Sequence, residues 1–137
     1  MGIKQTLKKM VSTKVETHEK HEDETLQTHY YKALKDKVIE EIEALLNKKQ
    51  GYEVASISEE HGEMIVNIKK GRKAFMVITV IMVRPFRTAV DFSIQTETFM
   101  FSDFGHSAKL ARELYKELNG RLTFIGTGLG EESSSRG

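Results

Sequence analysis

The sequence predicts an α+β fold: a two-layer sandwich with a long N-terminal helix, a four-stranded antiparallel meander and a C-terminal helix (α-β4-α). Two observations predict it. Two stretches repeat apolar residues at helical spacing, and four short apolar or alternating runs lie between them, joined by turn-rich connections. The chain has 137 residues, 39% hydrophobic and 30% charged, which suits one soluble domain with an apolar core.

Residues 1–22 are rich in lysine and then in glutamate, so we expect a polar and basic lead-in to the domain. Ile3, Leu7, Met10 and Val11 recur within it at helical spacing. A frayed terminus explains this pattern as well as a short amphipathic helix does. Such a helix would either dock on the sheet or lie on a membrane surface.

The first helix of the domain is predicted over residues 23–49. Asp23 is a suitable N-cap with Glu24 in the first turn, and Gly51 suits the end of the helix. The apolar stripe of this helix comprises Leu26, Tyr30, Ala33, Leu34, Val38, Ile42, Leu45 and Leu46.

Four strands follow in quick succession, and we expect them at residues 51–58, 63–70, 73–83 and 88–98. Short connections rich in turn residues favour an antiparallel meander. These connections are Glu60-His61-Gly62, Lys70-Gly71-Arg72 and Arg84-Pro85-Phe86-Arg87.

Residues 74–83 read AFMVITVIMV, and only Thr79 among them is not apolar. As a helix this run would span about 15 Å, half of a bilayer core, so we interpret it as a strand with two apolar faces. Residues paired across an antiparallel ladder share a face, and the turn lengths decide which residues pair. We expect a two-residue turn at 71–72 and a four-residue loop at 84–87. The helix-covered core face would then carry Phe75, Val77, Ile81 and Val83.

The opposite face of the predicted sheet carries a narrow apolar stripe, which we expect to be an interface formed by Ile65, Met76, Ile78, Val80 and Met82. Burying four such side chains is worth on the order of 6–12 kcal/mol, comparable to the stability of a domain. We therefore expect a small interaction or assembly protein that forms a homodimer. The chain's own N-terminus, another protein or a small apolar ligand could cover the face instead.

The last helix is predicted over residues 103–119, capped by Asp103 or Ser107 and followed by Gly120. Residues 121–125 would form a short extension that completes a single domain over residues 23–125. The Gly- and Ser-rich residues 126–137 predict a disordered tail.

This order of elements resembles frataxin in layout. The resemblance implies no iron-binding residue here, because the chain lacks tryptophan and its predicted first helix alternates glutamate and lysine.

The composition limits the chemistry that the protein can carry out. The absence of cysteine excludes disulfides, thiolate catalysis and cysteine-based metal sites. We find no arrangement of side chains typical of catalysis, so we expect neither an enzyme nor a cofactor. The formal net charge of +1 does not favour a strongly charged partner. Without a secretory signal in the sequence, a cytoplasmic location is the default expectation.

Two alternative functions depend on local clusters. A nucleic-acid interface could use Lys69, Lys70, Arg72, Lys73, Arg84 and Arg87. Successive meander turns lie at opposite ends of a sheet, however, so nucleic acid is an unlikely partner. If residues 18–29 were helical, a divalent metal could instead be held by His18, His21 and His29.

Overall fold

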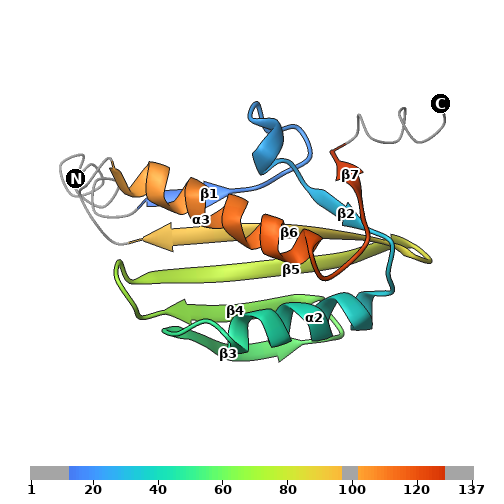
Figure 1. Cartoon of the computed structure of the whole chain (residues 1–137), viewed down its shortest axis with the longest axis horizontal. Helices are drawn as coiled ribbons and strands as arrows, with labels where there is room; N and C mark the ends of the chain where they lie inside the picture. The colour runs from blue at the N-terminus through green and yellow to red at the C-terminus, as the bar shows by residue number, and fades with distance from the viewer. Residues whose placement is uncertain (1–12, 97–101, 129–137) are drawn as a thin grey trace, which may run out of the picture.

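The computed structural model describes residues 13–96 and 102–128. Over these residues the chain forms one antiparallel sheet of seven strands, with two α-helices on one of its faces (Figure 1). The strands are β1 Thr13–Glu16, β2 His29–Tyr31, β3 Tyr52–Ser58, β4 Glu63–Ile68, β5 Ala74–Arg84, β6 Arg87–Thr96 and β7 Phe124–Thr127. The helices are α2 Lys35–Asn47 and α3 Ser102–Asn119, and a single 3-10 turn, η1, covers Glu24–Leu26.

The predicted α-β4-α sandwich is wrong, and the frataxin-like layout is wrong with it. The strand order is β3-β4-β5-β6-β2-β7, and β1 also pairs with β6. The four predicted strands form the β3 to β6 part of this sheet, and three short strands extend it. The possible helix within residues 1–12 and most of the predicted tail lie outside the described residues.

The long helix predicted over residues 23–49 is replaced by η1, β2 and the shorter helix α2. Asp23 does act as a cap, but its carboxylate accepts from the Thr25 amide in a single 3-10 turn. The segment His29–Tyr31 consists of residues that suit a strand, and it pairs with β6 on one side and β7 on the other. Backbone pairing at the open edge of β6 therefore outweighs a helical apolar pattern.

Two strands share the edge of β6. β1 pairs with its C-terminal half, from Ser93 to Thr96, and β2 pairs with its N-terminal part, from Thr88 to Val90. Residues 17–28 leave the sheet between these strands as a loop, which rises beside β2 in Figure 1. In the gap, the Thr17 amide donates to the Phe92 carbonyl at 2.9 Å, and the Phe92 amide donates to the Thr17 hydroxyl at 2.9 Å.

The register of the meander differs by one residue from the predicted one. Five residues, 69–73, connect β4 to β5, so Met64 pairs with Ile78 and Val66 with Met76. Only two residues connect β5 to β6, and a bulge between Met82 and Arg84 restores the pairing at the end of the hairpin. A shift of one residue exchanges the two faces of a strand. The predicted core and outer residues of β5 are therefore interchanged.

The core lies between the sheet and the two helices. Met76, Ile78 and Val80 of β5 are at most 1% exposed and belong to it. The helices contribute the buried residues Val38, Ile39, Ile42 and Leu46 of α2 and Ala111, Leu114, Tyr115 and Leu118 of α3. At the far end of the sheet, Gly62 adopts φ +67° and its carbonyl accepts from the Val80 amide at 2.7 Å. A side chain at Gly62 would collide with the Val80 carbonyl, so this turn requires glycine.

The last predicted helix is confirmed, with observed bounds of Ser102–Asn119 against a prediction of 103–119. The extension after it forms β7, which pairs with β2 and closes the second edge of the sheet. The tip of the β5–β6 hairpin projects beyond both helices in Figure 1.

Candidate functional site

The face of the sheet opposite the helices carries a row of apolar side chains on β5, which we call the outer row. It consists of Phe75, Val77, Ile81 and Val83. Phe75 is 43% exposed, and Ile81 and Val83 are each 52% exposed. Polar residues border the row on both sides, with Asn67 on β4 and Ser93 on β6 as examples. The outer row is thus a narrow apolar strip on the sheet face that α2 and α3 leave uncovered.

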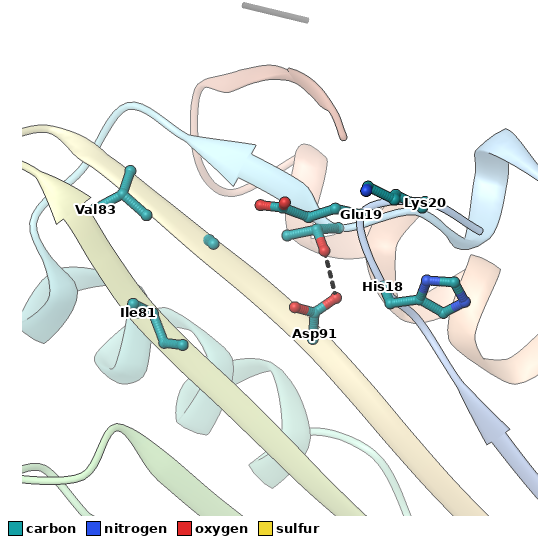
Figure 2. A pocket seen from close by; sticks show the side chains of 8 residues that line it. His18, Glu19, Lys20, Ile81, Val83 and Asp91 are labelled. Atoms are coloured by element: carbon teal, nitrogen blue, oxygen red, sulfur yellow. Dashed lines mark hydrogen bonds between the residues drawn. The ribbon is translucent and has the colours of Figure 1, made fainter. Parts of the chain in front are cut away.

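A pocket of about 400 Å³ opens at one end of the outer row. Its floor is formed by Ile81 and Val83 of β5 together with Ala89 and Asp91 of β6. Residues 18–20 and Thr28 form the wall, because the loop between β1 and β2 passes over the outer face at this point (Figure 2). The pocket therefore combines a floor that is apolar except for Asp91 with charged side chains of both signs, Glu19 and Lys20, on one wall.

Asp91 is the charged residue on the floor of this pocket. Its Oδ1 atom accepts hydrogen bonds from the hydroxyls of Thr17 at 2.7 Å and Thr28 at 2.8 Å. Burial is the main cause that raises the pKa of Asp91, and the nearby Glu19 carboxylate adds to the effect. Both of these bonds go to Oδ1, so Oδ2 is left to contact a ligand.

Glu19 lies on the wall of the pocket and is held by Tyr30, whose hydroxyl donates to the Glu19 carboxylate. The Arg87 guanidinium lies 4.9 Å from the centre of the Tyr30 ring, on its face, and Arg87 is buried. Burial is the main cause that raises the pKa of Tyr30. The His18 ring points away from Asp91 (Figure 2) and lies 5.0 Å from the His21 ring.

A chain of polar side chains leads from the pocket into the core. The Tyr115 hydroxyl donates to the Val90 carbonyl at 2.7 Å and lies 2.9 Å from the Thr17 hydroxyl, which in turn contacts Asp91. The His29 ring stacks on Tyr115 with ring centres 3.5 Å apart and planes 6° apart. Burial lowers the pKa of His29 to about 4, so this imidazole is neutral at pH 7.

The structure places most of the predicted interface residues in the core. Met76, Ile78 and Val80 are buried beneath the helices and are not available to a partner, for the register reason given above. Ile65 is on the outer face and is partly buried. Met82 is 41% exposed, but it pairs with Thr88 near the tip of the hairpin and lies outside the outer row.

The six basic residues of the predicted nucleic-acid interface do not form one patch. Lys69, Lys70, Arg72 and Lys73 lie in the β4–β5 turn, at the opposite end of β5 from Arg84. The 11 residues of β5 separate the two groups by about 35 Å. Lys69 also pairs with Glu53 at 3.0 Å.

The three histidines of the predicted metal site do not come together, because His29 is separated from the neighbouring His18 and His21. His18 and His21 are in the loop, whereas His29 is in β2 and is buried against Tyr115. Within residues 13–96 and 102–128, no group of three or more metal-ligating side chains is close enough to hold a metal ion.

Asp91, Thr17, Thr28 and Tyr115 are the site residues that the sequence alone does not identify. They come from four segments separated by up to 98 positions, and none belongs to a local motif. The one sequence signal is Asp91 itself, a carboxylate between Val90 and Phe92 and the one acidic residue of β6.

Among the described residues, neither helix is long and apolar enough to cross a membrane. No protein-family model, curated protein or solved structure matches this chain.

Proposed function

We propose that this protein is an interaction module that self-associates by packing the outer row against the outer row of a second copy. The observation that supports the proposal is the exposure of Phe75, Ile81 and Val83 in one line on a sheet face that neither α2 nor α3 covers. Phe86, in the hairpin turn beside them, is 56% exposed and extends the apolar surface. Contiguous apolar surface of this kind is typical of an interaction site.

The turn at Phe86 favours a functional reading of this surface. Phe86 adopts φ +62° and is the one described residue other than glycine with positive φ. Glycine would adopt this conformation without strain, whereas a bulky side chain there costs on the order of 1–3 kcal/mol. An exposed aromatic ring in a glycine position gives no evident gain to folding, so we assign it to binding.

Packing through the face is favoured over pairing through a sheet edge. The edge strand β3 has an irregularity between Val54 and Ser56, and such bulges hinder the addition of another strand. The strands at the other edge, β1 and β7, have only four residues each. Face-to-face packing of two copies also matches the two-fold symmetry that most homodimers have.

The expected affinity is weak. Fully burying such side chains is worth about 1.5–3 kcal/mol each, so half-exposed Phe75, Ile81, Val83 and Phe86 retain about 1 kcal/mol each. Two copies contribute about 8 kcal/mol, and the lowest estimates of the cost of association are about 4 kcal/mol. With smaller contributions from Ile65 and Val77, the dissociation constant should be on the order of 0.1 mM.

The test is sedimentation equilibrium of the wild-type chain and of Ile81→Lys between roughly 0.01 and 1 mM, concentrations that bracket the expected constant. We expect a monomer–dimer equilibrium for the wild type and a monomer for Ile81→Lys. Leu34→Lys is the matched control, because Leu34 is 44% exposed but precedes α2, which packs on the opposite face. A wild-type monomer throughout, or an equal effect of both substitutions, would contradict the proposal.

A further inference from the structure

Arg84 and the pocket lie on the same face of the sheet. Arg84 pairs with Arg87 across the hairpin, and paired residues share a face, so Arg84 is on the outer side with Asp91. Arg87 is buried on the ring of Tyr30, whereas Arg84 is exposed. Arg84 is therefore the arginine of this hairpin that a partner can reach.

Two carboxylates of the pocket, Asp91 and Glu19, can receive a cation in addition to the exposed Lys20, which lies on the same wall. The Asp91 oxygen Oδ2 is left for a ligand, and the Glu19 carboxylate lies close enough to Asp91 for the two like charges to repel. A guanidinium between them would relieve this repulsion. The floor of Ile81, Val83 and Ala89 suits the methylene stem of an arginine side chain.

Arg84 cannot reach the Asp91 of its own chain. Asp91 is directly opposite Thr79 in the register, and Thr79 lies five residues before Arg84 on β5. At about 3.3 Å per residue these two positions are roughly 16 Å apart, farther than an arginine side chain extends. The ion pair is therefore available only between two molecules.

We infer that the pocket at Asp91 receives the Arg84 side chain of a second copy, in addition to the packing of the outer rows. This inference rests on the proposed self-association. In this arrangement the β5 strands of the two copies are antiparallel, and the two-fold axis passes between Ile81 and Met82. Arg84 of one copy then lies opposite Thr79 of the other, whose neighbour on β6 is Asp91. The same operation makes the contact twice, once in each direction. The outer rows then fix the position of the copies, and the two ion pairs fix their register.

A double-mutant cycle measures this contact. The dissociation constant is determined by sedimentation equilibrium for the wild type, Arg84→Gln, Asp91→Asn and the double variant. Asparagine keeps an oxygen that accepts from Thr17 and Thr28, so the fold of the pocket is preserved. We expect each single substitution to weaken the dimer roughly tenfold and the double variant to be no weaker than either. Lys73→Gln removes an exposed cation at the other end of β5 and should leave the constant unchanged.

The outcomes separate this inference from the proposed function. A wild-type dimer whose two single substitutions weaken binding additively, or not at all, overturns the contact between Arg84 and Asp91 while self-association stands. A wild-type monomer at every concentration overturns both. If Asp91→Asn fails to fold, Arg84→Gln alone decides, because an unchanged dissociation constant for that exposed variant excludes the contact.

Discussion

Acidification should destabilise this protein through His29. The side chain is 6% exposed, stacks on Tyr115, and donates from Nδ1 to the Gln27 carbonyl at 2.8 Å. Burial lowers its pKa from the ordinary value of 6.5 to about 4. As the pH falls through this window, the unfolded chain binds a proton on His29 that the folded chain does not bind. Stability from the neutral imidazole is therefore complete above about pH 6.5 and is lost progressively toward pH 4.

The magnitude follows from the size of the pKa shift. A shift from 6.5 to about 4 corresponds to about 3 kcal/mol, at about 1.4 kcal/mol for each pH unit. Asp91 acts in the opposite direction, because its raised pKa makes the folded chain hold a proton more tightly than the unfolded chain. The effect of His29 must therefore be measured as a difference from a variant that keeps Asp91.

His29→Phe is that variant, since phenylalanine preserves a ring to stack on Tyr115 but does not titrate. Urea unfolding at a series of pH values from 7.5 to about 4 gives the free energy of unfolding of both chains. On acidification the wild type should lose about 3 kcal/mol more than His29→Phe, whatever their difference at pH 7.5. The exposed His106→Gln serves as the control and should follow the wild type. Parallel curves for the wild type and His29→Phe would refute this reasoning.

Three further experiments test other parts of the structure. Thr17→Val leaves the buried Phe92 amide without its acceptor, so urea unfolding should show a loss of about 1–3 kcal/mol, whereas Thr17→Ser should lose less. Phe86→Gly removes the strain at φ +62°, so the free energy of unfolding should be unchanged or about 1 kcal/mol higher, while self-association should weaken. A clear loss of stability would show instead that the Phe86 ring packs in the folded monomer. Ile78→Ala should cost about 2–5 kcal/mol and Ile81→Ala less than about 1 kcal/mol, whereas the reverse order would contradict the observed register.

The sequence predicted the elements that local patterns determine. The last helix and the four strands of the meander appear close to their predicted bounds, because each carries a clear period and ends at turn residues. The failures come from interactions distant in sequence. The segment from Leu26 to Leu34 matches a helical stripe, yet its residues 29–31 pair with residues 88–90 and 124–127. No local signal in the sequence identifies this pairing.

The faces of β5 were mispredicted for a geometric reason. The sequence shows that residues 74–83 are apolar on both sides, but it does not give the number of residues in each turn. The predicted turn has two residues, 71–72, whereas the observed connection has five, 69–73. This odd difference changes the partner of Val66 from Val77 to Met76 and so exchanges the two faces. The pocket could not be predicted at all, because Thr17, Thr28 and Asp91 meet only after β1 and β2 have paired with β6.

Cross-linking of single-cysteine variants tests the packing of the outer rows most directly. The chain contains no cysteine, so a variant with one thiol can be cross-linked only to another copy. With a short bismaleimide at roughly 0.1 mM protein, the expected dissociation constant, Ile81→Cys should give a covalent dimer. Leu34→Cys, similarly exposed but at the N-cap of α2, should remain monomeric. Equal cross-linking at both positions, or none at position 81, would contradict self-association through the outer row.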